Sequence, residues 1–189
     1  MKQINQYYQA LCETAHSKAE EKGWWQNPLS LQSNLMLIIT ECAEMVNADR
    51  RRIYANIGAM KKAIGNRNIE ETPFEWKNAF EAYVKDTVED ELADTMIRIA
   101  DLAGFLKVDF SRFNRINYQR DFDKYEFADN VFVLVKALVN EGYSKPRRIL
   151  FAMQYIIDFA DYIGCDLNLH IRMKLAYNST RPIKHGKSY

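Results

Sequence analysis

The chain has 189 residues, of which 26 are lysine or arginine and 25 are aspartate or glutamate. This near-neutral balance gives no reason to expect nucleic acid or an anionic membrane as a partner, and no apolar run reaches membrane-spanning length. Its three cysteines are scattered and form no C-x-x-C pair, which argues against a disulfide framework or a zinc site. We therefore expect one soluble, cytoplasmic domain over residues 1–189.

Apolar residues recur at helical spacing along nearly the whole chain, and few glycines or prolines interrupt them. The pattern predicts an all-α fold. Its expected helices cover about 4–22, 28–52, 73–107 with room for a break near 82–86, 109–118, 127–140, 146–163 and 167–180. Asn27 followed by a proline is the expected N-cap of the second helix, and Thr72 opens a capping-box signature before the third. Residues 53–72 are expected to be a loop with some helix.

Two short acidic motifs each place two carboxylates three residues apart: Glu41 with Glu44, and Glu91 with Asp94. Helical residues at i and i+3 point roughly the same way, so each pair can hold one ligand. If the two helices lie side by side, four carboxylates come together and repel one another unless a cation lies among them. Hard oxygen ligands of this kind suit Mg²⁺ or Mn²⁺ rather than zinc.

The surroundings of the two acidic pairs differ. Residues one turn from Glu41, such as Ile38 and Met45, are apolar, so we expect the first pair on an apolar face. A carboxylate there is costly unless it is paired or bound to a metal. The second pair has an alternative explanation, because Arg98 follows Asp94 by one turn and can pair with it on an ordinary solvated face.

The C-terminal segment is basic and has a helical spacing of its own. Lys174, Asn178, Arg181 and His185 recur at i, i+4, i+7 and i+11, and they share one face if the helix persists. Such a stripe, with Lys187 extending its charge, suits an anionic ligand that accepts hydrogen bonds. The alternative is a solvated, frayed terminus.

Two further residues are candidates for substrate binding. Arg51 follows Glu44 by two turns and can contact a phosphate, or it can simply favour the helix C-terminus. Trp25 and its neighbour Trp24 precede the helix of the first acidic pair, and one of them can stack on a base. Core packing is the alternative for at least one of these indoles.

A weak internal repeat relates residues 101–109 to residues 158–166. In this register the second half has Arg148 and Phe151 in place of the second acidic pair, so we expect it to bind no metal. Chance similarity between two amphipathic helices is the alternative explanation.

Glu41-x-x-Glu44 followed by Glu91-Leu-Ala-Asp94 resembles the paired motifs of the MazG-like, all-alpha nucleoside triphosphate pyrophosphohydrolases. The closing Lys174-Leu-Ala-Tyr-Asn178-Ser-Thr-Arg181-Pro-Ile-Lys-His185-Gly186-Lys187 is similar to the ending of one MazG-like subgroup. The resemblance covers residues 24–107 well and the tail fairly well. The two acidic motifs are farther apart than in the family, which makes 53–72 an insertion.

The resemblance implies Mg²⁺-dependent hydrolysis of a nucleoside triphosphate to the monophosphate and pyrophosphate, with Mn²⁺ as a substitute ion. Carried over, the metal ligands are Glu41, Glu44, Glu91 and Asp94. Either Glu41 or Glu44 is also the expected acceptor of the proton from the attacking water. The preferred base and sugar stay open.

The resemblance also implies a MazG-like helical bundle, and such units bury their apolar stripe by pairing. Together with the repeat, this predicts an internal pseudo-dimer with a first half over about 1–120 and a degenerate second half over about 121–189. Basic residues of the second half, such as Lys136, and of the tail are expected to line one side of a single active site. The chain is then a monomer or a homodimer.

Two other classes of protein contain clustered acidic residues on helices. A non-catalytic helical interaction module, with the acids as ion pairs between helices, is the main alternative. A di-iron carboxylate bundle requires two Glu-x-x-His pairs, and the sequence has one, Glu13-Thr-Ala-His16.

Overall fold

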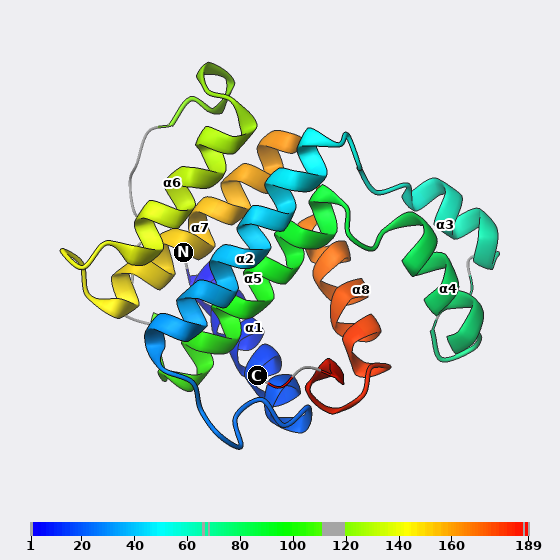
Figure 1. The fold of residues 1–189 in the computed structure, drawn as a ribbon, viewed down its shortest axis with the longest axis horizontal. Coiled ribbons are helices and arrows are strands. Elements are labelled where there is room, and N and C mark those ends of the chain that lie inside the picture. The colour runs from blue at the N-terminus through cyan, green and yellow to red at the C-terminus, as the bar shows by residue number, and fades with distance from the viewer. Residues whose placement is uncertain (1, 66, 68, 111–119, 187, 189) are drawn as a thin grey trace.

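The computed structural model describes residues 2–65, 67, 69–110, 120–186 and 188. Within these ranges the protein contains eight α-helices and no strand, which confirms the predicted all-α fold. The helices are α1 (Lys2–Glu21), α2 (Leu31–Arg50), α3 (Ile57–Ile64), α4 (Pro73–Tyr83), α5 (Val88–Phe105), α6 (Phe127–Val139), α7 (Lys145–Ile163) and α8 (Leu167–Ser179) (Figure 1). Most of the helix predicted over 109–118 falls outside the described residues.

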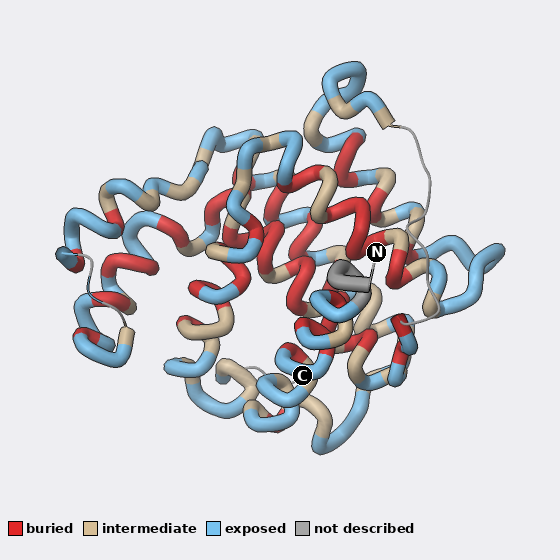
Figure 2. The backbone as a smooth tube through the Cα atoms, turned by 180° about the vertical axis from the view of Figure 1, so that it is seen from behind, coloured by how far each residue is buried: buried red, intermediate tan, exposed pale blue. Residues whose placement is uncertain are grey.

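Helix α5 is the centre of the bundle, and α1, α2, α7 and α8 all pack against it. It is buried on most of its surface, polar residues such as Asp90 and Glu91 included, and Leu92, Met96 and Ile99 are completely buried. Figure 2 shows that the buried residues run through the middle of the molecule. Any polar side chain on α5 is therefore held by several neighbouring helices at once.

The hairpin formed by α6 and α7 packs against α2 and α5, the two helices that carry the acidic motifs (Figure 1). Leu134 of α6 and Met153 and Ile156 of α7 belong to the same apolar core as α5. The α6–α7 hairpin therefore lies against the two helices that carry the acidic motifs.

Helices α3 and α4 form an arm that extends from the bundle beside α8 (Figure 1). The arm has a small core of its own, in which Trp76 and Phe80 of α4 pack with Tyr177 of α8. The rings of Phe80 and Tyr177 are stacked, with centroids 4.7 Å apart. Part of the segment predicted as a loop with some helix is thus α3, and the arm supports α8 from the side.

Several helix boundaries depend on caps. Helix α2 starts later than predicted, because Ser30 rather than Asn27 is its N-cap and accepts a hydrogen bond from the backbone N–H of Ser33. Thr72 is the N-cap of α4, but its side chain makes no capping hydrogen bond. The break expected near 82–86 is present, and Thr87 caps α5 by accepting from the N–H of Asp90.

No helix in the described part of the chain combines the length and the apolar character that crossing a membrane demands.

Candidate metal centre and binding cavity

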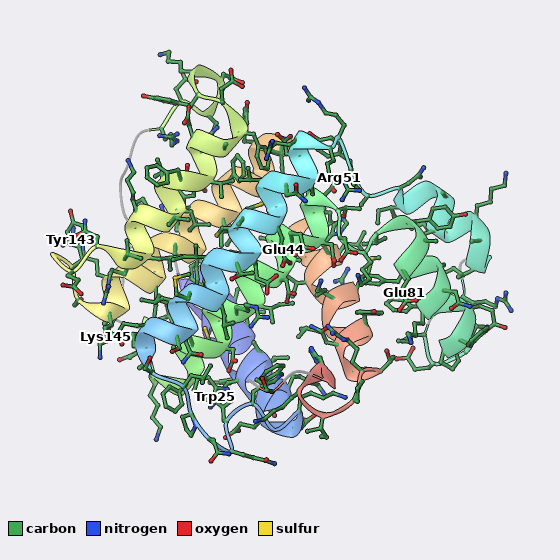
Figure 3. The ribbon with its side chains drawn as sticks, in the orientation of Figure 1. Trp25, Glu44, Arg51, Glu81, Tyr143 and Lys145 are labelled. Carbon is green, nitrogen blue, oxygen red and sulfur yellow. The ribbon has the colours of Figure 1, made fainter. Side chains whose placement is uncertain are left out.

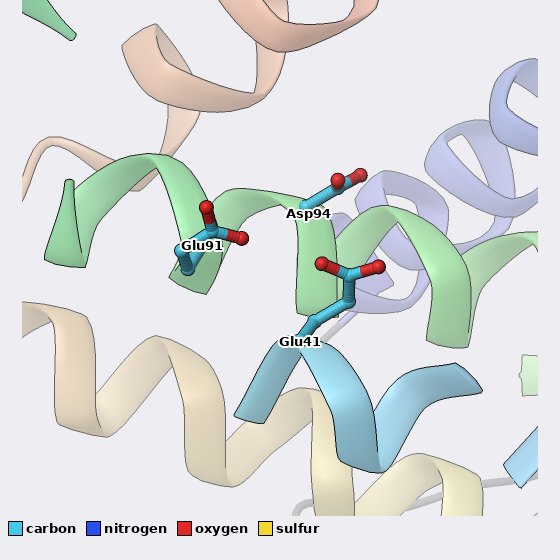
Figure 4. A group of neighbouring side chains, drawn as sticks. All are labelled: Glu41, Glu91 and Asp94. Carbon is cyan, nitrogen blue, oxygen red and sulfur yellow. The ribbon is translucent and has the colours of Figure 1, made fainter. Parts of the chain in front are cut away.

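Three carboxylates from two helices lie together at the α2–α5 interface: Glu41 of α2, and Glu91 and Asp94 of α5 (Figure 4). Each has an oxygen within 4.8 Å of an oxygen of the others. Glu41 is 5 % and Glu91 is 4 % exposed, whereas Asp94 is partly open. The i, i+3 spacing on α5 and the packing of α2 against it produce this group.

Burial makes this group electrostatically unfavourable. It raises the pKa of Glu91 to about 9, and the charges of Asp90, Asp94 and Glu41 add to that effect. Burial and the Asp94 charge likewise raise the pKa of Glu41, although Arg98 opposes the shift. A divalent cation would relieve this repulsion, so the donor set fits a hard metal ion.

Two cations of the chain partly neutralise the group. The Nε of Arg98 lies 2.5 Å from Oε1 of Glu41. The Nζ of Lys174 lies 2.7 Å from Oδ2 of Asp90 and 3.4 Å from Oδ2 of Asp94. Burial alone would raise the pKa of Asp94, but Lys174 and Arg98 outweigh it and the pKa is lowered. Arg98 forms its ion pair with Glu41 on the other helix, and its charge also acts on Asp94, its neighbour on α5.

Glu44, the fourth expected ligand, is not part of the three-carboxylate group. It is exposed on α2, and the expectation that it stands on an apolar face was wrong. A helix turns about 100° per residue, so three residues leave the side chain about 60° from Glu41. That offset places Glu44 at the rim of the cavity described next, which it still lines (Figure 3).

The carboxylates open into a cavity of about 420 Å³ between α1, α2, α5, α8 and the tail. Its lining includes five of the residues predicted to bind substrate or to extend the basic stripe: Trp25, Lys174, Asn178, Arg181 and His185. One wall is thus acidic and the facing elements supply positive charge. Such a cavity can accommodate an anion together with a cation.

The tail reaches the cavity by a turn rather than by the continuous helix that was predicted. Helix α8 ends at Ser179, and Lys184 and His185 have positive φ angles of 48° and 51°. Lys22 of the α1 end holds this turn, because its Nζ donates to the carbonyl oxygens of Ser179 (2.8 Å) and Arg181 (2.6 Å). The described part of the tail is therefore folded onto the protein. Lys187 lies outside the described residues.

Two polar atoms in the cavity wall are buried without a hydrogen-bond partner among the described residues: Oδ1 of Asn178 and Nε2 of His185. Burial, assisted by the Arg181 charge, lowers the pKa of His185 to about 4, so the ring is neutral near pH 7. Buried polar atoms are normally paired. A ligand in the cavity is one way to complete their hydrogen bonds.

Trp25 is fixed on the rim by Asp101 of α5. Its Nε1 donates to Oδ1 of Asp101 at 2.7 Å, and its ring stacks on Phe105 with centroids 4.0 Å apart. The same carboxylate oxygen lies 2.8 Å from Nδ1 of His16 on α1. Gly104 permits this close helix contact, since a Cβ there would lie 2.6 Å from Cβ of His16.

Sequence reasoning missed Asp101, His16 and Asp90. Asp101 follows Asp94 by seven residues, which is two helical turns, and this spacing was a signal for it. The partner relationships of His16 and Asp90 involve other helices, so no spacing within the sequence points to them.

Two residues expected near the site are elsewhere. Arg51 is exposed at the C-terminal end of α2 and does not line the cavity (Figure 3). Lys136 is exposed on α6 above the ring of Phe132. In the described part of 127–163 no residue lines the cavity, so its basic residues come from α1, α5 and the segment before it, α8 and the tail, and not from the second helical hairpin.

Comparison of the chain with protein-family models, curated proteins and solved structures finds no match.

Proposed function

We propose that the protein hydrolyses a nucleoside triphosphate to the nucleoside monophosphate and pyrophosphate with the help of Mg²⁺, as its resemblance to the MazG-like enzymes implies. The observation that supports this most is the three-carboxylate group at one wall of a cavity whose other walls carry cations. The acidic residues are Glu41, Glu91 and Asp94, and the cations are Lys174 and Arg181. Metal-bound triphosphates need both kinds of group.

Glu41, Glu91 and Asp94 would hold the ion, since three clustered carboxylates match the preference of Mg²⁺ or Mn²⁺ for oxygen ligands. When bound, it would neutralise phosphate oxygens and lower the pKa of a coordinated water. Glu44, exposed at the rim, is available as a further ligand or as the proton acceptor. Glu41 is the other candidate for that second role.

The basic side of the cavity is suited to the phosphates and the aromatic rim to the base. Arg181 can form charge-assisted hydrogen bonds with phosphate oxygens. Trp25, held by Asp101 and backed by Phe105, presents a fixed indole at the rim on which a base can stack. Stacking tolerates every base, so the preferred base and sugar have to be determined by experiment.

At the level of the fold, we propose a MazG-like bundle that is an internal pseudo-dimer. The α6–α7 hairpin covers apolar surface of α2 and α5 without lining the cavity. This is the packing role that a second copy would have in a paired unit. A stable monomer with one site per chain is then feasible, and light scattering of the purified protein tests it.

The test of the activity is a panel of ribo- and deoxyribonucleoside triphosphates, standard and damaged, incubated with Mg²⁺ and analysed for both products. We expect stoichiometric monophosphate and pyrophosphate from at least one substrate. Release of inorganic phosphate and a diphosphate would instead mean attack at a different phosphorus. No turnover across the panel would contradict the proposal.

The ion pairs favour one second candidate, a helical module in which the acids stabilise helix contacts. Arg98 with Glu41 and Lys174 with Asp90 satisfy part of the acidic group without any metal. Metal binding separates the two functions. A purely structural role predicts no saturable Mn²⁺ binding, whereas the proposed enzyme binds Mn²⁺ at Glu41, Glu91 and Asp94.

A further inference from the structure

A buried lysine lies where two groups of carboxylates meet. Lys174 of α8 is 5 % exposed and Asp90 of α5 is 1 % exposed. The Nζ of Lys174 is 2.7 Å from Oδ2 of Asp90 and 3.4 Å from Oδ2 of Asp94. Burying an ammonium is costly unless it is paired, and here it is paired with two carboxylates. The lysine is therefore a fixed internal cation and not a mobile surface group.

The two carboxylate groups share Glu91. One consists of Glu41, Glu91 and Asp94, and the other of Asp86, Asp90 and Glu91, with oxygens within 4.8 Å of one another in each. Two-metal phosphate hydrolases hold their ions about 3.5–4 Å apart, which requires adjacent ligand groups of this kind. The carboxylates by themselves would suit two divalent ions.

Lys174 contacts one member of each group and brings a positive charge to the junction. Its ammonium donates a hydrogen bond to Oδ2 of Asp90, which is the most buried residue of the second group. A divalent ion among Asp86, Asp90 and Glu91 would lie beside that ammonium and be repelled by it. In the first group only Asp94 forms an ion pair with Lys174, at 3.4 Å, while the more distant charge of the lysine also acts on Glu91.

We propose that the Lys174 ammonium is the second cation of this site, so that each chain binds one divalent ion, held by Glu41, Glu91 and Asp94. This inference rests on the proposed function, because it concerns the same metal centre. An ammonium has three N–H donors; one donates to Oδ2 of Asp90, and Oδ2 of Asp94 lies 3.4 Å from the same nitrogen. This leaves an N–H for a phosphate oxygen in the cavity, which Lys174 lines.

Asp90 also shows how the second group would behave without the lysine. Its Oδ1 is buried with no hydrogen-bond partner among the described residues, while Oδ2 accepts from Lys174 and from the N–H of Asp86. Asp86 is exposed, so an ion can reach the group from solvent. Truncating Lys174 therefore leaves a carboxylate group that can take a second divalent ion.

The experiment counts Mn²⁺ ions on the full chain by calorimetry and examines their coupling by electron paramagnetic resonance. The wild type should bind one Mn²⁺ per chain, with the spectrum of an isolated ion. Lys174→Ala should bind two, with spin coupling between them. The double variant Lys174→Ala/Asp86→Asn should return to one, and the matched single variant Asp86→Asn should stay at one.

Two coupled ions in the wild type would overturn the inference, and so would a single ion in a folded Lys174→Ala protein. If the alanine variant does not fold, Lys174→Met, which has a similar length and no charge, is interpreted in the same way, and the wild-type count is decisive in either case. No bound Mn²⁺ in the wild type would refute the metal centre itself, and with it the proposed function. A count of two refutes only the role of Lys174.

Discussion

Arg98 and Glu41 form an ion pair across the α2–α5 interface, with Nε and Oε1 2.5 Å apart. Glu41 is also one of the three carboxylates that would hold a divalent ion. The arginine and the metal therefore compete for one carboxylate. A substitution of Arg98, which is not itself a metal ligand, should therefore change the affinity of the centre for the ion.

Arg98→Gln should bind Mn²⁺ more tightly than the wild type, because a positive charge beside the ion is removed. An effect of about 1 kcal/mol, or roughly fivefold in Kd, is the scale expected for a partly screened charge. The metal-free variant should also melt at a lower temperature, since Glu41 loses its partner. Calorimetry with Mn²⁺ measures the affinity, and Arg98→Lys, which keeps the charge, is the control. Weaker binding by Arg98→Gln than by Arg98→Lys would contradict this account.

Glu91→Gln and Asp94→Asn should both abolish hydrolysis but shift the stability of the metal-free protein in opposite directions. Burial and neighbouring carboxylates raise the pKa of Glu91 to about 9, so its charge is unfavourable in the folded state. The pKa of Asp94 is lowered, since Lys174 and Arg98 outweigh its burial. Thermal unfolding in a chelator should show a rise for Glu91→Gln and a fall for Asp94→Asn, each by roughly 2–8 °C for about 1–2 kcal/mol. Shifts of the same sign would show that the local charges are wrongly assigned.

Asp101 should make the stability of the protein depend on pH. Burial raises its pKa from 3.8 to about 6, although the hydrogen bonds with His16 and Trp25 oppose the shift. Because the folded pKa lies above the unfolded one, the protonated acid favours the folded state, and this contribution is lost as pH rises from about 4 through 6. Asp101→Asn has no such loss, so its stability relative to the wild type should increase over this window by on the order of 2–3 kcal/mol.

Denaturant unfolding at several pH values measures this difference. Asp161→Asn, at an exposed aspartate near the end of α7, is the matched control and should show no such trend. A difference between Asp101→Asn and the wild type that stays constant from pH 4 to 7 would exclude a raised pKa at Asp101.

Lys22 should matter for substrate affinity although it is far from the acidic group in sequence. It holds the carbonyls of Ser179 and Arg181, and so fixes the turn that brings His185 to the cavity. Removing residues 181–189 should raise KM by about tenfold or more, the loss expected for one or two charge-assisted hydrogen bonds. Lys22→Met should raise KM in the same direction with a smaller effect on kcat. Lys62→Met, on the exposed side of α3, is the control, and an unchanged KM in the truncated protein would refute a role for the tail.

The helices and the acidic group were predictable from the sequence because both depend on local spacing. A period near 3.6 places Glu91 and Asp94 on one face of α5 whatever surrounds them. Neighbouring apolar residues correctly indicated that Glu41 is buried. The assumption that residues three apart share a face misplaced Glu44. Its side chain is about 60° around α2 from Glu41, which puts it at the cavity rim rather than in the helix interface.

Features that depend on contacts between helices were not predictable. Lys174 lines the cavity, but the packing of α8 against α5 also pairs it with Asp90, which no spacing in the sequence indicates. We expected His185 to lie at the site because we assumed that the last helix continues to it. It reaches the cavity because the chain turns after Ser179 and Lys22 holds that turn.

The most direct test of the central claim is hydrolysis of a nucleoside triphosphate in ¹⁸O-labelled water with Mg²⁺, followed by phosphorus NMR of the products. The account predicts unlabelled pyrophosphate and a monophosphate that carries the label, because water attacks the α-phosphorus at a metal held by Glu41, Glu91 and Asp94. Asp94→Asn, measured alongside, should give neither product. Label in the pyrophosphate, or full activity in Asp94→Asn, would contradict it.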